Sequence, residues 1–332
     1  MGSKISKVET YLPERVLTNE HLAAEFGRWE PQKIEAKLGI TERHISEKDE
    51  TAGDMGFKAA ERLFEYYDRN NIDMLILCTQ SPDYFLPTTA CVLQDRLDLR
   101  TDIGAYDFNL GCSGFIYGLA MAKGFINSNI AENVLLITSE TYSKHIHPHD
   151  LANKTIFGDG AAATIIEKSL KDQIGQFILG TDGKGKNNLI VPNGGFRSAI
   201  DLNAEEKSSG SGDVYTDNNL FMNGPEIFNF TIDAVPIAIE NCIARNNMKI
   251  EDVDYFIFHQ ANKYIIDFLR KMIKIPKEKF YSDMLNTGNT VSSTIPIGYK
   301  NAISSGTISE GSKVLLCGFG VGYSWGAVMV EV

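Results

Sequence analysis

The sequence predicts an α/β protein built from two similar halves. Three observations support this fold class: short apolar runs alternate with amphipathic stretches of helix length, the order of these segments repeats, and the repeats are separated by a nearly constant shift in residue number. Strands that alternate with helices are typical of α/β proteins. With 332 residues, 43% of them hydrophobic, the chain is long enough to bury a core in each half.

The individual elements follow from these patterns. Short apolar runs predict strands at residues 74–78, 105–108, 134–138, 161–166, 256–258, 314–317 and 327–330. Amphipathic stretches predict helices at residues 52–67, 114–127, 226–245 and 263–273.

The repeat is clearest around two short motifs. Asn-Leu-Gly-Cys, which ends at Cys112, and Asn-Thr-Gly-Asn, which ends at Asn289, are each expected to open a helix that leads to an apolar strand. Upstream of each motif lies a matching strand. We therefore expect two homologous halves, residues 1–170 and 171–332. A Gly-, Ser- and Asn-rich stretch at 180–219 is the candidate linker and surface loop, with no expected chemistry.

Charge and composition narrow the function classes. A formal net charge of -11 argues against nucleic acid or an anionic membrane surface as a partner, because phosphate groups are held by clustered Lys and Arg. No apolar run approaches the roughly 20 residues that span a bilayer, so a cytoplasmic protein is expected. The 5 scattered cysteines form no CxxC pair, which favours reduced thiols over zinc or disulfides.

Cys112 is the leading candidate for a nucleophile. It lies between Gly111 and the pair Ser113-Gly114, after a predicted strand and before a predicted helix. A sulfur at a helix N-terminus is expected to favour the thiolate, because the helix dipole and free N–H groups stabilise negative charge. A free cysteine is more often a buried structural side chain than a nucleophile, and we expect this structural role for the other four cysteines. The flanking glycines, which let a substrate approach closely, favour a catalytic role at Cys112.

His259 and Asn289 are the candidate partners of Cys112. His259 ends a predicted strand at the carboxyl edge of the sheet, where ligand sites of α/β proteins gather. Asn289 occupies the place in the second half that Cys112 occupies in the first, although simple helix capping also explains an Asn there. Two side-chain N–H groups beside a sulfur nucleophile suit the enolate oxyanion left when a malonyl thioester loses carbon dioxide.

Other motifs carry weaker predictions. The run His145-Ile146-His147-Pro148-His149 has the spacing of a metal chelate, but its proline and neighbouring aspartate favour a solvated loop, so no metal is expected. The glycine-rich loop at 318–322 lacks a nucleotide-binding pattern. It is instead a candidate for presenting a backbone N–H, near Gly320 and Val321, to an acyl oxygen.

The chain resembles the β-ketoacyl-acyl-carrier-protein synthase III family of the thiolase superfamily over essentially its whole length. The matching stretches are residues 39–43, 82–91, 109–114, 157–161, 222–224, 259–262, 288–290 and 324–326. The resemblance implies a five-layered αβαβα fold, a homodimer and a catalytic triad of Cys112, His259 and Asn289. It also implies that Asn262 binds the phosphopantetheine arm and that Leu86 reaches across the dimer interface to limit the acyl pocket.

The resemblance implies an acyltransferase that loads Cys112 from a thioester and then condenses the acyl group with a malonyl thioester. No separate cofactor is expected, since the phosphopantetheine belongs to acyl carrier protein or coenzyme A. The basic run that includes Lys263, Arg270, Lys271 and Lys274 is a candidate docking surface for the acidic carrier protein. A solvated helix face explains the same charges equally well.

Three positions depart from the family. The region that usually carries an adenine-stacking Trp reads Lys-Ile-Glu-Ala-Lys at 33–37, a family Arg is Leu151, and Val321 replaces a usual Gly. These changes suggest a specialised relative in secondary metabolism or surface-glycan acylation. Two alternatives stay open: acyl transfer from Cys112 to an alcohol or amine without a new carbon–carbon bond, and a non-catalytic partner subunit.

Overall fold

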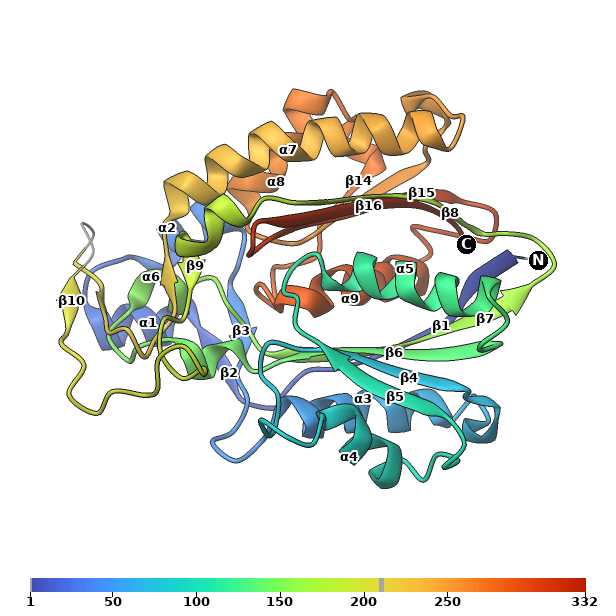
Figure 1. The fold of residues 1–332 in the computed structure, drawn as a ribbon. Coiled ribbons are helices and arrows are strands. Elements are labelled where there is room, and N and C mark those ends of the chain that lie inside the picture. Colours follow the sequence, from blue (N-terminus) through green and yellow to red (C-terminus); the bar gives the residue numbers. More distant parts are fainter. Residues whose placement is uncertain (1, 209–211) are drawn as a thin grey trace.

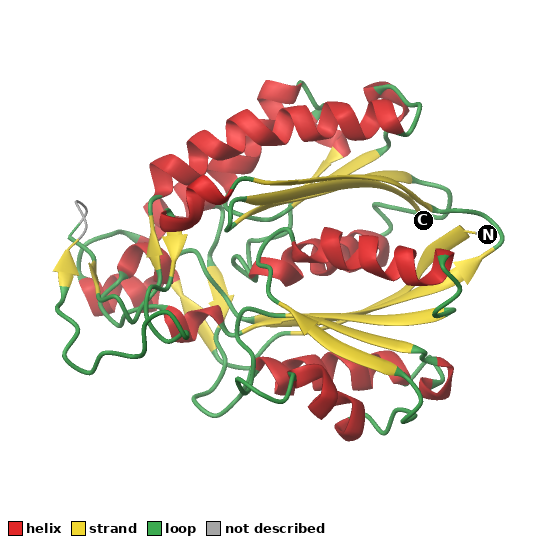
Figure 2. Ribbon diagram, in the orientation of Figure 1, coloured by secondary structure: helices red, strands yellow, loops and turns green. Residues whose placement is uncertain are grey.

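The computed structural model describes residues 2–208 and 212–332. Five layers of secondary structure stack in the order helices, sheet, helices, sheet, helices (Figure 1). Figure 2 shows the two sheets separated by the central helical layer. The α/β thiolase-like fold expected from the sequence is therefore confirmed.

The first sheet has the strand order β1-β7-β6-β4-β5. Its strands are β1 (Gly2–Tyr11), β4 (Met74–Cys78), β5 (Gly104–Phe108), β6 (Asn133–Glu140) and β7 (Gly160–Ser169). The β4 strand is parallel to both β5 and β6, and its five residues are all buried. This burial explains the uninterrupted apolar sequence of β4, because a strand covered on both faces has no polar side.

The second sheet repeats this arrangement with the order β14-β13-β15-β16-β8. Its strands are β8 (Ile174–Thr181), β13 (Tyr255–Phe258), β14 (Phe280–Tyr281), β15 (Lys313–Gly320) and β16 (Ser324–Glu331). The β13 strand is parallel to β14 and β15, as β4 is to its neighbours. Two similar mixed sheets agree with an internal duplication, and the boundary between residues 170 and 171 stays a prediction.

Helices fill the space between the sheets and cover their outer faces. The central layer holds α5 (Gly114–Asn127) and α9 (Thr294–Ser304), while α3 (Ala52–Phe64) and α4 (Thr89–Arg96) cover the first sheet (Figure 1). The second sheet is covered by α7 (Gly224–Arg245) and α8 (Lys263–Ile273). Residues of α5 and α9 share one hydrophobic core with strands of both sheets, so the halves are packed as one body.

The shorter elements form a lobe at one end of the stack (Figure 1). They are β2 (Val16–Thr18), α1 (Asn19–Phe26), α2 (Pro31–Leu38), β3 (Glu42–His44), α6 (Leu151–Lys154), β9 (Leu189–Ile190), β10 (Lys207–Ser208), β11 (Val214–Tyr215) and β12 (Phe221–Met222). Pairing of β9 with β12 gives structure to part of the expected linker at 180–219. Residues 209–211 of that stretch lie outside the described residues.

Several expected elements differ in their bounds. The helix expected at 52–67 ends at Phe64, and the one expected at 226–245 begins two residues earlier, at Gly224. The expectation that Asn289 opens a helix is wrong, since α9 begins at Thr294 after a 3₁₀ turn, η6 (Val291–Ser293). Within the described residues, α7 is the one helix with the length and hydropathy of a membrane span, and it is a partly buried core helix containing Pro236.

Candidate active site

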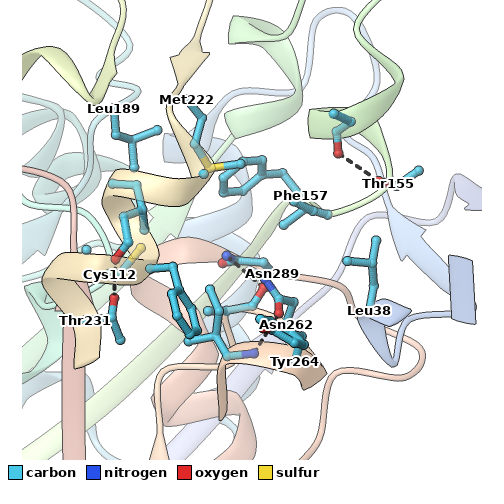
Figure 3. Close-up of a pocket in the computed structure, with 18 of the residues that line it drawn as sticks. Leu38, Cys112, Thr155, Phe157, Leu189, Met222, Thr231, Asn262, Tyr264 and Asn289 are labelled. Carbon is cyan, nitrogen blue, oxygen red and sulfur yellow. Dashed lines mark hydrogen bonds between the residues drawn. The ribbon is translucent and has the colours of Figure 1, made fainter. Parts of the chain in front are cut away.

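A cavity of about 550 Å³ lies between the ends of the two sheets. Its walls include Cys112 from the first half and His259, Asn289 and Gly320 from the second. Figure 3 shows Cys112 on one side of this cavity and Leu38 on the opposite side, with Asn289 between them. Most of the remaining lining is apolar, which suits an acyl chain and the methylene groups of a thioester arm.

Cys112 sits in the turn between β5 and α5, two residues before the helix begins. Its side chain is buried, with 5% of its surface exposed. A Cβ atom on Gly320 would lie 2.9 Å from the Cys112 sulfur, so the sulfur keeps its place only because residue 320 is glycine. The backbone N–H groups of Cys112 and Val321 face the sulfur and act to lower its pKa.

The protonation state of Cys112 differs from the sequence-based expectation. Burial raises the pKa of the Cys112 thiol to about 12, and the nearby Glu140 adds a smaller increase. The two backbone N–H groups lower the pKa, but by less than burial raises it. The expected thiolate is therefore wrong for the resting protein, which holds a neutral thiol. Because the thiolate is the reactive form, the site requires a group that takes the proton when Cys112 reacts.

His259 follows the last residue of β13, as expected from the sequence, and is 2% exposed. Its Nδ1 lies 2.7 Å from the Thr294 hydroxyl. Burial lowers the pKa of His259 to about 3, opposed weakly by the Val291 carbonyl, so the resting ring is neutral. A neutral imidazole has one nitrogen free to accept a proton.

Asn289 is held by the turn that follows it. Its Oδ1 accepts a hydrogen bond from Val291 N at 2.9 Å. Its Nδ2 therefore points the other way, to 3.5 Å from both His259 Nε2 and the Ala261 carbonyl. Val291 has a φ of 56°, an unusual backbone conformation for a β-branched residue that the surrounding contacts must stabilise. The structure thus presents the amide N–H groups of Asn289 to the cavity.

Of the four residues predicted to bind substrate, two line the cavity and two do not. Asn262 lines the cavity and caps α8, its Oδ1 accepting from Ile265 N at 3.0 Å. Gly320 lines the cavity, whereas Val321 contributes its backbone N–H and packs behind it. Leu86 is 80% exposed on a loop outside the cavity. The binding roles of these residues stay predictions.

The basic side chains of the α8 region differ in whether they are free to contact a partner. Lys263 forms an ion pair with Asp267, and Arg270 donates to the Ile275 carbonyl at 3.0 Å. Lys271 and Lys274 are exposed at the helix end. These two lysines are therefore the better candidates for contact with a partner.

The histidine run forms no metal site. His145 is partly buried, with its Nε2 3.5 Å from the Ser81 hydroxyl, and His147 Nε2 lies 3.9 Å from Glu206. Across residues 2–208 and 212–332, no group of three or more His, Cys, Asp or Glu residues has the arrangement of a metal site.

Several cavity residues were not found from the sequence. Leu189 lines the cavity, although its stretch was expected to carry no chemistry. Trp29 and Lys37 line the exposed end, with the Lys37 ammonium 5.9 Å from the Trp29 ring centre. Trp29 precedes residues 33–37, the region in which the family pattern has its Trp. Trp29 was missed because the overall fold, and no local motif, brings it and the following helix α2 to the cavity.

Comparisons relate the whole chain to known proteins. One family model, described as 3-oxoacyl-[acyl-carrier-protein] synthase III, matches residues 106–183, and a second, described as the C-terminal part of the same synthase, matches residues 243–332. A Clostridium perfringens protein named β-ketoacyl-[acyl-carrier-protein] synthase III is 35% identical over 97% of each chain. A crystal structure of a 3-oxoacyl-(acyl-carrier-protein) synthase III is 45% identical, covers 100% of both chains and has a TM-score of 0.99. The structure of a β-ketoacyl-[acyl-carrier-protein] synthase III from Thermus thermophilus is 33% identical, the match covers 99% of both chains, and the TM-score is 0.87.

Proposed function

We propose, from the premise that this chain belongs to the 3-oxoacyl-[acyl-carrier-protein] synthase III family of condensing acyltransferases, that its reaction passes through Cys112, His259 and Asn289. Cys112 takes an acyl group from a thioester. A malonyl thioester then enters the same cavity, loses carbon dioxide and attacks the acyl-cysteine. The product is a β-ketoacyl thioester, and Cys112 is released for another cycle.

The first half-reaction builds a negative charge on the acyl oxygen. The backbone N–H groups of Cys112 and Val321, which face the sulfur, are positioned to donate to that oxygen. The Cys112 proton passes to His259 and then to the departing thiolate, so the thiol of the donor is released. Gly320 leaves the space in which the acyl carbon approaches the sulfur.

The second half-reaction builds a negative charge on the thioester oxygen of the malonyl group. The observation that carries this assignment is the orientation of Asn289, whose Oδ1 is occupied by Val291 N and whose Nδ2 faces the cavity beside His259. A fixed donor of this kind stabilises an enolate without reorganising as charge develops. Single-turnover acylation, followed by carbon dioxide release from a labelled malonyl thioester, tests the two halves separately.

The alternative of simple acyl transfer to an alcohol or amine has less support. Such a reaction has no enolate, and it gives no role to a preorganised amide donor opposite the sulfur. The full-length likeness to condensing enzymes favours carbon–carbon bond formation. An intact cysteine, histidine and asparagine in one cavity also disfavours a non-catalytic subunit.

The thioester arm is proposed to enter between α2 and α8. Asn262 lies at the start of α8 on the cavity wall, while Trp29 and Lys37 lie at the exposed end. An aromatic ring beside an ammonium group suits a nucleotide base and its phosphates. This placement supports coenzyme A as one acyl carrier, despite the departure at residues 33–37.

Replacing Trp29 with alanine is expected to raise KM for an acyl-coenzyme A on the order of tenfold, because stacking of a base on an aromatic side chain contributes about 1–3 kcal/mol. KM for an acyl-pantetheine, which lacks the nucleotide, should stay unchanged. Steady-state kinetics with both donors measure the difference. Trp29→Phe is the control, since it keeps a ring; an equal rise in both KM values in Trp29→Ala would contradict nucleotide stacking.

Acyl carrier protein is proposed to dock beside the same opening, on the basic end of α8. Charge reversal in the double variant Lys271→Glu, Lys274→Glu is expected to lower kcat/KM for a carrier-bound malonyl group by about tenfold, because rim charges steer association. Turnover of malonyl-coenzyme A should change little. The double variant Lys7→Glu, Lys48→Glu, at two exposed lysines outside α8, is the matched control. A loss of similar size in that control would assign the effect to net charge.

A homodimer is proposed through the edge of the first sheet. β5 is the outer strand of that sheet, and all five of its residues are half-buried. Exposed Phe85 and Leu86 lie on a nearby loop, where Phe85 contacts the ring of Phe196. Edge strands and exposed apolar patches are typical of subunit interfaces. The partner's copy of this loop would bring a leucine towards the acyl end of the cavity.

We place the enzyme in the cytoplasm, with its thiols reduced.

A further inference from the structure

Glu140, the last residue of β6, is a fully buried carboxyl group beside the active site. Its Oε1 lies 3.0 Å from the Ser292 hydroxyl, and its Oε2 accepts a hydrogen bond from Gln80 N at 3.0 Å. Gln80 belongs to the first half of the chain and Ser292 to the second. The two oxygens of one carboxyl group therefore join the two halves.

Ser292 is the middle residue of η6, the turn that fixes Asn289. The residue before it, Val291, donates its N–H to Asn289 Oδ1 at 2.9 Å. The residue after it, Ser293, has its hydroxyl 3.0 Å from the Thr138 carbonyl in β6. All three residues of η6 are buried. Two consecutive serines thus fasten to β6 the turn that directs the Asn289 amide into the cavity.

Gln80 lies against the loop that carries Cys112. Its Nε2 donates to Asn109 Oδ1 at 3.0 Å. A Cβ atom on Gly111 would lie 2.6 Å from Gln80 Oε1, so this side chain packs directly on the backbone that precedes Cys112. One oxygen of Glu140 is thereby connected to the loop of the nucleophile, and the other is connected to the turn of the oxyanion donor.

We infer that Glu140 is a positioning residue that fixes the turn of Asn289 relative to the loop of Cys112, with Ser292 as its contact in the second half. This inference rests on the proposed function of Asn289. The amide donor and the sulfur come from different halves, so their separation depends on contacts that cross between the halves. A displacement of about 1 Å in a reacting group can lower a rate on the order of 100-fold, even when the substituted residue touches no substrate.

The protonation of Glu140 indicates which replacement is conservative. Burial raises the pKa of Glu140 to about 8, although the Gln80 N–H and the serine hydroxyls act to lower it. The group is therefore mostly protonated at neutral pH, with one acceptor oxygen and one O–H donor. Glutamine has the same shape and also pairs an acceptor oxygen with a donor. Glu140→Gln should therefore keep both contacts, whereas Glu140→Ala removes both.

The test measures the two half-reactions separately in the full-length protein. Ser292→Ala removes the contact with the turn of Asn289 and leaves the contact with Gln80 in place. This variant should acylate Cys112 at close to the wild-type rate. It should release carbon dioxide from a labelled malonyl thioester about 10–100-fold more slowly. Glu140→Ala should slow both half-reactions, and Glu140→Gln should restore both rates.

Ser139→Ala is the matched control. Ser139 is buried in the same strand, and its hydroxyl donates to the Ala52 carbonyl of α3 at 2.7 Å. The control therefore loses a comparable buried hydrogen bond without any contact with η6, and it should keep both rates. The double variant gives a second measurement. In Asn289→Ala protein, Ser292→Ala should cause little further loss of carbon dioxide release, because its effect acts through Asn289.

Three results would overturn the inference. The first is a Ser292→Ala protein that releases carbon dioxide at the wild-type rate. The second is an equal loss in Ser139→Ala, which would assign the effect to weakened packing. The third is a loss from Ser292→Ala that persists in full when Asn289 is already alanine. Failure of the proposed function looks different: Asn289→Ala alone would then release carbon dioxide at the wild-type rate, and the inference would fall with it.

Discussion

Cys112→Ala is expected to abolish the covalent acyl intermediate and to lower turnover on the order of 10⁴–10⁶-fold, because the reaction loses the atom that carries the acyl group. The sulfur is the one nucleophile on the described cavity wall that lies under two backbone N–H groups and against Gly320. Intact-protein mass spectrometry after incubation with a panel of acyl thioesters measures the result. Wild-type protein should gain the mass of one acyl group, and the variant should gain none.

Cys91→Ala is the matched control, because Cys91 is the exposed cysteine among the five and reacts most readily with a thioester in solution without any active site. This variant should keep both the adduct and the turnover. An adduct that persists in Cys112→Ala and disappears in Cys91→Ala would assign the acylated residue to the surface thiol and remove the basis of the proposed mechanism. The same spectra identify the acyl chain lengths that the cavity accepts.

Asn289→Ala is expected to separate the two half-reactions. Its amide faces the cavity and has no part in activating the thiol, so the variant should acylate Cys112 at close to the wild-type rate. Loss of one preorganised oxyanion donor typically costs on the order of 10²–10³ in rate, and this loss should fall on decarboxylation and condensation. Carbon dioxide release from a labelled malonyl thioester, measured with pre-acylated enzyme, gives the effect.

His259→Ala provides the comparison, because its ring is assigned to both halves. It should slow acylation as well as condensation, since the neutral thiol of Cys112 loses its proton acceptor. The double variant should lose less than the two single losses combined, because the two side chains lie 3.5 Å apart in one cavity. If wild-type protein acylates yet releases no carbon dioxide from any malonyl donor, and Asn289→Ala behaves in the same way, condensation is excluded and simple acyl transfer takes its place.

The inner elements of the fold could be predicted because their sequences are governed by burial. The strands β4, β6 and β13 are covered on both faces and read as apolar runs, and α5 and α8 have the bounds expected from their patterns. The outer strands β1 and β8 were missed. Both lie at sheet edges with half-exposed residues, and β1 includes Lys4, Lys7 and Glu9, so their sequences resemble those of loops.

The chemistry of the site could be predicted only in part. The repeat along the chain indicated that Cys112, His259 and Asn289 face one another, and the structure brings them to one cavity. The protonation of Cys112 could not be predicted, because burial outweighs the two backbone N–H groups and burial is a property of the whole fold. Trp29 and Thr294 were missed for a related reason: Trp29 lines the cavity together with residues of α8, and Thr294 contacts His259, so each meets residues that are distant in sequence.

The pairing of β1 affects when the first sheet is completed during synthesis. β1 precedes every other strand of the first sheet in the sequence, yet its neighbour in the sheet is β7, with Gly2 opposite Ser169. At about 5–20 residues per second, its partner strand is complete roughly 8–32 s later. Until β7 is available, β1 has no strand to pair with, and the apolar side chains of Ile5 and Val8 are not held against the central core. β1 therefore joins its sheet last, and a change in this strand acts on the closing step in the assembly of the first sheet.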